Sequence, residues 1–313
     1  MRDVIAAALD RGSEVAYLGE VAERQRKEAL ASADAVLAWI LGDELRSEEL
    51  AHLGSAGLIQ LASAGVDQVP FDQIPAGVPV ASNAGAYGEP MSEHVLALAL
   101  ALAKRLPQNH AALARGVFDH VTPTRSINGS LVGILGFGGI GQASARLFQA
   151  FGAHVSAINR SGRTDAAVDR IGTMEDLDAL LGVANILVVS LPLTRATAGL
   201  IGRRELSLMT PDAILVNVAR AAIIDEDALY EHLVGNPSFS AGIDAWWQEP
   251  RGQITFATRR PFMNLPNVIG TPHNSAIVAG SLTEAVAGAA ENVARHFRGE
   301  PVRNLVDRAD YVA

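Results

Sequence analysis

The chain has 313 residues, of which 49% are hydrophobic and 19% charged, a composition that suits two domains or one large one. Its net charge of −9, without a clustered basic stripe, argues against a nucleic-acid partner. The lack of cysteine excludes disulfides, a thiol nucleophile and cysteine-ligated metals, and it fits a reducing cytoplasm. We expect no secretory signal, because Asp10 and Arg11 come before any long apolar run. We expect no membrane span, because the longest apolar run, residues 95–103, is about half a span's length. No metal site is predicted.

The first hundred residues alternate helical and strand patterns. Charged segments predict helices over 20–31 and 46–53, and the apolar run predicts the buried part of a helix over 91–104. Short apolar segments predict strands at 35–39, 57–62 and 78–81. The small-residue turn Ser63-Ala64-Gly65-Val66-Asp67 directly follows the second of these strands.

From residue 131 the alternation becomes more regular. A helix is predicted over 141–151, and short Val/Ile-rich segments predict strands at 131–135, 154–158, 185–190, 213–218, 240–244 and 267–270. Such strands, separated by helices or turns, are typical of a parallel sheet that is covered on both faces. The right-handed crossover rule then favours a doubly wound α/β topology.

The last segment predicts a return of the chain to its first domain. A helix is expected over 282–297, after which residues 301–306 would dock on that domain. We therefore predict a discontinuous first domain, residues 1–98 and 282–313, and a second domain, residues 99–281.

The segment Gly136-Phe137-Gly138-Gly139-Ile140-Gly141 is a dinucleotide-binding fingerprint in its proper context, since a predicted strand precedes it and a predicted helix follows. Gly136 would permit the tight turn, Gly138 would let a pyrophosphate approach, and Gly141 would let the helix pack against the strand. The amides of the first helical turn would then face the anion.

The second strand of such a fold normally ends in a carboxylate that binds the ribose 2′-hydroxyl of NAD and repels a 2′-phosphate. Here Asn159 occupies that position, and Arg160, Ser161 and Arg163 follow before the first acidic residue. Because guanidinium groups pair with phosphate, the pattern favours NADP(H) over NAD(H). A solvated basic turn is the alternative interpretation.

Three isolated polar residues follow predicted strands in the second half: Arg220, Glu249 and His273. Each alone is ordinary for a surface loop. Ligands of open α/β sheets bind at the carboxyl ends of the strands, so their occurrence beside a dinucleotide loop points to a shared active site.

With these motifs in place, the chain resembles the D-isomer-specific 2-hydroxyacid dehydrogenases over nearly its whole length, in particular their NADPH-preferring glyoxylate/hydroxypyruvate reductase-like branch. The supporting segments are residues 63–67, the glycine loop 136–141, Leu191-Pro192-Leu193-Thr194, Val216-Asn217-Val218-Ala219-Arg220, Asp244-Ala245-Trp246-Trp247-Gln248-Glu249-Pro250 and Thr271-Pro272-His273. The resemblance implies a Rossmann cofactor domain and a smaller, discontinuous flavodoxin-like substrate domain.

The resemblance also implies roles for matching residues. Arg220 would bind substrate, Glu249 and His273 would form an acid–base pair, and the amides around Ala64 and Gly65 would anchor the substrate carboxylate. The implied cofactor contacts are Gly136, Gly138, Gly139, Ile140, Gly141, Asn159, Arg160, Ser161, Arg163, Leu191, Pro192, Thr197, Val218, Ala219 and Asp244, the last near the nicotinamide.

Reduction of a 2-keto acid needs these residue types. Arg220 can fix the carboxylate and polarise the carbonyl with one planar group. His273 is the general acid suited to neutral pH, and Glu249 would favour and orient its imidazolium. Closure of the two domains would exclude water during the reaction.

Three features depart from the family pattern. Ala221 follows Arg220 where the family usually has glycine, which would be strained if that position requires a positive φ. Trp246 and Trp247 are bulky and either wall the pocket or, as we favour, pack a domain interface. His94 stands at the start of an apolar helix, where an interface or capping role is expected rather than catalysis.

Two alternative functions stay open. A phosphite- or formate-type dehydrogenase would share the fold, although formate-specific relatives pair the histidine with glutamine in place of a glutamate such as Glu249. A dinucleotide-sensing, corepressor-like scaffold would belong to a different class, because fold alone does not fix function. Homodimerisation through the cofactor domain is expected from the resemblance.

Overall fold

The computed structural model describes residues 1–9, 12–250 and 255–312. The chain forms two compact units, Met1–Tyr87 with Val278–Ala313, and Gly88–Ile277. The sequence-based boundary at residue 98 falls inside helix α5 (Gly88–Ala103), which packs as a whole on α7 and on strands β8 and β9 of the second unit. The apolar pattern of α5 predicts a buried helix but does not reveal which sheet it covers.

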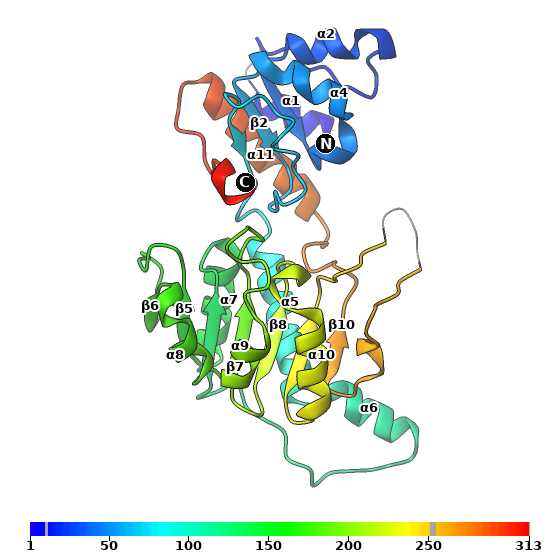
Figure 1. Cartoon of the computed structure of the whole chain (residues 1–313), viewed down its shortest axis with the longest axis vertical. Helices are drawn as coiled ribbons and strands as arrows, with labels where there is room; N and C mark the ends of the chain where they lie inside the picture. Colours follow the sequence, from blue (N-terminus) through cyan, green and yellow to red (C-terminus); the bar gives the residue numbers. More distant parts are fainter. Residues whose placement is uncertain (10–11, 251–254, 313) are drawn as a thin grey trace. The chain divides into compact units, whose positions relative to one another are not determined.

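The second unit is built on a seven-stranded parallel sheet with the order β10-β9-β8-β7-β4-β5-β6 (Figure 1). Its strands are β4 (Leu131–Leu135), β5 (His154–Ile158), β6 (Arg170–Gly172), β7 (Ile186–Val189), β8 (Ile214–Asn217), β9 (Ser240–Ile243) and β10 (Val268–Gly270). The doubly wound topology is thereby confirmed. The chain order reverses at β4, which lies between β5 and β7, and ligands of such sheets bind at the carboxyl ends of the strands beside this point.

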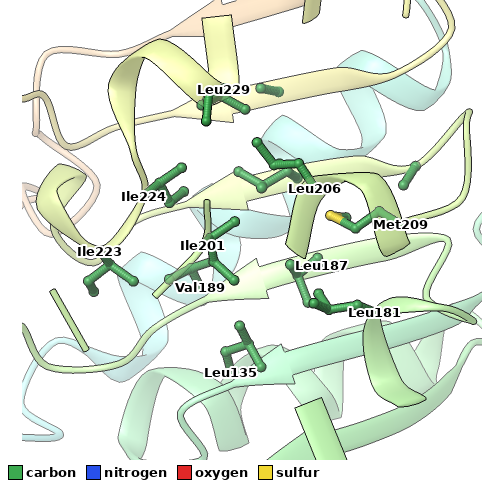
Figure 2. Close-up of a cluster of buried hydrophobic side chains, with 14 of the residues drawn as sticks. Leu135, Leu181, Leu187, Val189, Ile201, Leu206, Met209, Ile223, Ile224 and Leu229 are labelled. Carbon is green, nitrogen blue, oxygen red and sulfur yellow. The ribbon is translucent and has the colours of Figure 1, made fainter. Parts of the chain in front are cut away.

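Helices cover both faces of this sheet. Alternate residues of β9 show the two sides: Ala241 and Ile243 join one core cluster, whereas a side chain at Gly242 would meet Leu98 of α5. The cluster opposite α5 gathers leucine, isoleucine, valine and methionine side chains around β7, including Leu187 and Val189 (Figure 2). The helices of this unit are α5, α6 (Leu106–Ala114), α7 (Gly139–Ala150), α8 (Leu177–Leu181), α9 (Arg203–Leu208) and α10 (Glu226–Gly235).

The first unit contains a three-stranded parallel sheet of β1 (Ala35–Ala38), β2 (Leu58–Leu61) and β3 (Val80–Ala81). Its helices are α1 (Arg2–Ala8), α2 (Arg26–Ala31), α3 (Leu41–Glu44), α4 (Ser47–Leu50) and α11 (Ser281–Phe297). The C-terminal segment docks here as expected: Leu305 bridges antiparallel to Ala81, and the Val306 amide donates to Val80 O at 2.8 Å.

The predicted elements differ from the observed ones mainly where polar helices are short. The helix predicted over 20–31 divides into a 3₁₀ turn at Glu23–Gln25 and α2, and the helix predicted over 46–53 divides into α4 and a 3₁₀ turn at Ala51–Ser55. Short β6 and the exposed helix α6 were not predicted from the sequence, since neither has a buried periodic face. Within the described residues, no helix has the length and apolarity that crossing a membrane requires.

Candidate active site

The glycine loop connects β4 to α7 and has the geometry that its three key glycines require. Gly136 has a φ of +95°, and a Cβ there would lie 2.7 Å from the Leu191 amide nitrogen. A Cβ on Gly141 would lie 2.2 Å from Gly136 O, so the helix can start this close to the strand only with glycine. Both positions are therefore fixed by packing within the protein.

Gly138 is different, because a Cβ there would meet no protein atom within 4 Å. Its backbone is extended, and α7 begins at Gly139. The first amides of a helix have no intrahelical acceptor and attract anions. Open space beside these amides of Gly139 and Ile140 is what a pyrophosphate needs, so the residues present fit a dinucleotide.

Asn159 organises the loop that follows β5. Its Oδ1 accepts from the Ser161 amide at 3.1 Å and the Gly162 amide at 2.7 Å, and its Nδ2 donates to Arg163 O at 2.8 Å. The side chains of Arg160, Ser161 and Arg163 lie at the surface of this loop. Asn159 thus holds a basic turn at the strand end where a ribose-binding carboxylate is usually found.

A second turn lies beside the glycine loop, after β7. The Ser190 hydroxyl donates to Gly136 O at 2.7 Å, which joins the two turns. The Thr197 hydroxyl donates to Pro192 O at 2.7 Å and accepts from the Thr194 amide at 2.8 Å. Thr197 therefore closes this turn, whose partly buried Leu191 and exposed Pro192 are candidate cofactor contacts.

Glu249 and His273 form a pair at the carboxyl ends of β9 and β10. His273 Nδ1 lies 2.8 and 2.9 Å from the two carboxylate oxygens of Glu249, and the side chains are 34% and 37% exposed. Because Nδ1 faces Glu249, Nε2 is the ring atom left to meet a substrate. Burial raises the pKa of the Glu249 carboxyl, but hydrogen bonds from His273 and the Trp246 amide, with the charges of His273 and Arg220, leave that pKa below its ordinary value.

Arg220 follows β8 in a turn that Asn217 holds. Asn217 Nδ2 donates to Arg220 O at 3.1 Å, and Asn217 Oδ1 accepts from the Ala219 amide at 3.0 Å. The Arg220 guanidinium is close enough for its charge to lower the pKa of Glu249. Ala221 begins a 3₁₀ turn and does not have a positive φ, so the strain considered for alanine here does not arise.

Asp244 is fully buried after β9 and binds the loop that carries His273. Its Oδ1 accepts from the Thr271 hydroxyl at 2.6 Å and the Asn274 amide at 3.1 Å, and its Oδ2 accepts from the Ser275 amide at 3.2 Å. Burial raises the pKa of the Asp244 carboxyl, but the hydrogen bonds from Ser275 and Thr271 and the charge of His94 hold it below its ordinary value. The carboxylate is thus ionised at neutral pH and anchors this loop.

The two tryptophans pack inside the second unit. Trp247 stacks on Phe262 with ring centroids 5.3 Å apart, and its Nε1 donates to Ile224 O at 2.8 Å. Trp246 packs edge-on against Phe256 and donates to Thr271 O at 2.8 Å. Both tryptophans therefore have packing and hydrogen-bond partners within the second unit.

The sequence did not reveal three features of the site. His273 has a φ of +51°, a conformation uncommon for a residue with a side chain. Gly88 lets α5 approach the glycine loop, since a Cβ there would lie 3.0 Å from Gly139 O. His94 lies within α5 rather than at its cap, and its Nε2 is 3.0 Å from Thr271 Oγ1. The glycine and histidine types were visible, but their contacts depend on the packing of distant segments.

The candidate carboxylate anchor belongs to the first unit. The Ser63 hydroxyl donates to Gly65 O at 3.0 Å, which shapes the turn that contains Ala64. Ala62 O, just before this turn, accepts from Tyr87 Oη at 2.8 Å and Asn83 Nδ2 at 3.1 Å. The turn after β2 is therefore held by buried polar groups of its own unit.

The glycine loop generates a paired prediction. Gly138→Ala should keep the thermal stability of the wild type and weaken NADPH and NADH binding, because its Cβ would occupy space that is open in the protein. Gly141→Ala should lower the melting temperature, because its Cβ would clash with Gly136 O. Calorimetry and dinucleotide fluorescence titration measure both effects. Unchanged dinucleotide affinity in Gly138→Ala would argue against this location of the pyrophosphate.

Comparison with known proteins identifies a family. The sequence model of the D-isomer specific 2-hydroxyacid dehydrogenase, NAD binding domain, matches residues 96–275. Glyoxylate/hydroxypyruvate reductase B of Pectobacterium carotovorum is 32% identical over 286 residues, which cover 89% of this chain and 87% of that protein. D-3-phosphoglycerate dehydrogenase of Methanocaldococcus jannaschii is 31% identical over 265 residues, which cover 84% of this chain and 48% of that protein. The chain thus spans about half the length of the phosphoglycerate dehydrogenases that it matches.

Solved structures show the same similarity. A candidate formate dehydrogenase from Pyrobaculum aerophilum is 33% identical with a TM-score of 0.77, covering 86% of this chain and 87% of that one. A D-isomer specific 2-hydroxyacid dehydrogenase from Xanthobacter autotrophicus, in complex with NADPH and MES, is 26% identical with a TM-score of 0.78, covering 99% and 96%. The chain belongs to the D-isomer-specific 2-hydroxyacid dehydrogenase family.

Proposed function

We propose that the protein is an NAD(P)-dependent D-2-hydroxyacid dehydrogenase that reversibly reduces a small 2-keto acid, with NADPH as the preferred cofactor. The observation that carries the proposal is the contact of His273 Nδ1 with both carboxylate oxygens of Glu249, at the same sheet edge as the glycine loop. A paired histidine is a general acid and base for the interconversion of a carbonyl and an alcohol. The cytoplasmic location inferred from composition stays a prediction.

His273 supplies and removes the proton in this proposal. Glu249 holds Nδ1, so Nε2 donates to the substrate oxygen during reduction and accepts from the hydroxyl during oxidation. The ionised Glu249 stabilises the imidazolium and fixes the ring orientation. When bound, the reduced nicotinamide supplies the hydride for the substrate carbon.

Arg220 binds the substrate carboxylate and polarises the carbonyl oxygen. A planar guanidinium presents two donors in one plane, a geometry that matches a 2-keto acid. The amides of Ala64 and Gly65 are proposed to bind the same carboxylate as a further anchor. Val218 and Ala219 remain proposed cofactor contacts, and Asp244 is proposed to lie near the nicotinamide.

The substrate is proposed from the relatives' names. Glyoxylate and hydroxypyruvate are the first candidates, because relatives that share most of this chain are named reductases of these acids. A formate-type activity is the second candidate, since a structural relative is described as a candidate formate dehydrogenase. Glu249 in place of glutamine disfavours that activity. A non-catalytic, dinucleotide-sensing scaffold would bind cofactor without turnover.

A catalytic test follows from the pair. His273→Ala and Arg220→Ala should each lower kcat/KM for the best 2-keto acid by at least ~10²-fold, the scale for losing a positioned acid or charge. The assay uses a panel of 2-keto acids, with formate and phosphite in parallel arms, and His154→Ala as an exposed histidine control. Near-wild-type turnover in either site variant would contradict the assignment, as would turnover of formate or phosphite alone.

The preference for NADPH rests on the loop that Asn159 holds. Charge-assisted hydrogen bonds contribute about 1.5–3 kcal/mol each, or roughly ten- to a hundredfold in affinity. Arg160→Ser with Arg163→Ser should therefore lower the NADPH/NADH ratio of kcat/KM at least ~10-fold. Arg203→Ser, an exposed arginine on α9, serves as the control. A wild-type kcat/KM for NADH that equals or exceeds that for NADPH would contradict the preference.

We propose further that the protein is a homodimer formed through α6 and the segment after it. Large apolar side chains gather there on the surface: Leu106, Leu113, Val117, Phe118 and Val121 are 51–77% exposed. Helix α6 extends from the second unit, and the chain then returns to β4 through the segment after the helix (Figure 1). Several large exposed apolar side chains in one segment favour an interaction site there.

The dimer proposal predicts a change in mass. Phe118→Asp combined with Val121→Asp should convert a dimeric wild type to a folded monomer, because two charges would replace apolar contact surface. Sedimentation velocity measures the mass, and Val183→Asp, at an exposed valine after α8, is the control. A monomeric wild type, or a double variant that stays dimeric, would contradict this interface.

A further inference from the structure

A chain of hydrogen bonds connects α5 to the loop that carries His273. His94 Nε2 lies 3.0 Å from Thr271 Oγ1, and Thr271 Oγ1 lies 2.6 Å from Asp244 Oδ1. His94 is 22% exposed, and Asp244 is fully buried. No catalytic, substrate-binding or cofactor-binding role assigned above includes His94.

The direction of these bonds follows from proton count. A threonine hydroxyl has one proton, and an ionised carboxylate can only accept. The Thr271 hydroxyl therefore donates to Asp244 and accepts from His94, which places a proton on Nε2 of His94. His94 Nε2 is also 3.8 Å from Asp244 Oδ1, so the donor on Nε2 lies beside the carboxylate as well as the hydroxyl.

The Asp244 carboxylate also accepts hydrogen bonds from the backbone that follows His273. Asp244 accepts from the amides of Asn274 and Ser275 at 3.1 and 3.2 Å. His273 itself has a φ of +51°, a conformation that persists only where its surroundings hold it. The Asp244 carboxylate contacts Thr271 before His273, and Asn274 and Ser275 after it. These contacts on both sides restrain the backbone of His273.

We propose that His94 is a positioning residue, which holds the Thr271 hydroxyl against Asp244 and thereby keeps His273 in its left-handed backbone conformation, with Nδ1 on Glu249. This inference rests on the proposed function for its catalytic consequence. A displacement of about 1 Å of a catalytic group can cost on the order of a hundredfold in rate. His94 would thus affect the chemical step through Thr271 and Asp244 without touching substrate.

Conservative substitutions separate this role from simple packing. The amide of glutamine reaches about as far as Nε2 of histidine, whereas the amide of asparagine reaches only as far as Nδ1. His94→Gln should keep kcat within ~3-fold of the wild type, while His94→Asn and His94→Ala should lose at least ~10-fold in kcat with little change in KM. His154→Ala is the matched histidine control.

Amide hydrogen exchange tests the restraint without turnover. In the cofactor-free protein, exchange at Asn274 and Ser275 should accelerate in His94→Ala and His94→Asn and return to the wild-type rate in His94→Gln. Thr271→Val should give the same acceleration, and adding His94→Ala to it should add little, because both act on one chain of bonds. The melting temperature of each variant controls for general loss of structure.

The two levels of the proposal fail in different ways. Wild-type protein that turns over no 2-keto acid would contradict the proposed function, and the exchange measurement would still test the restraint. Wild-type kcat and unchanged exchange in His94→Ala would overturn the positioning role. So would equal losses in His94→Gln and His94→Asn, which would indicate packing rather than the Nε2 donor.

Discussion

The parallel arrangement of the seven strands is the constraint on which the site depends. Parallel strands end at one edge of a sheet, so the loops after β4, β5, β7, β8, β9 and β10 all begin at that edge. The glycine loop, the Asn159 turn, Arg220, Asp244 and the loop of His273 are brought together by this topology. Their separation along the chain, up to 137 residues between Gly136 and His273 (273 − 136), has no bearing on their proximity.

Polar side chains then fix each loop at that edge. Asn159 holds the basic turn, Asn217 holds the turn of Arg220, and Asp244 holds the loop of His273. Each of these side chains forms hydrogen bonds with backbone groups that no strand or helix satisfies. The exposed side chains that would contact ligands therefore lie on loops whose backbones are fixed by hydrogen bonds to these polar side chains.

Much of this arrangement could be predicted from the sequence because the signals are local. The strand at 154–158 matches β5, and Gly136 and Gly141 have the steric reasons expected of them. The family resemblance predicted that Glu249 and His273 form a pair. The apolar face of α5 does not identify the sheet that it covers, so the boundary predicted near residue 98 falls within that helix. The positive φ of His273 and the contact of His94 with Thr271 could not be predicted, since both arise from segments far apart in the chain.

The central claim is that the pair of His273 and Glu249 serves reduction of a 2-keto acid to one isomer of its alcohol. Chiral chromatography of the reaction product tests this most directly. The reaction uses NADPH with hydroxypyruvate, or with an analogue of glyoxylate that has a prochiral carbonyl. The account predicts stoichiometric NADPH oxidation and a product of D configuration alone. No oxidation with any 2-keto acid, or an L or racemic product, would contradict it.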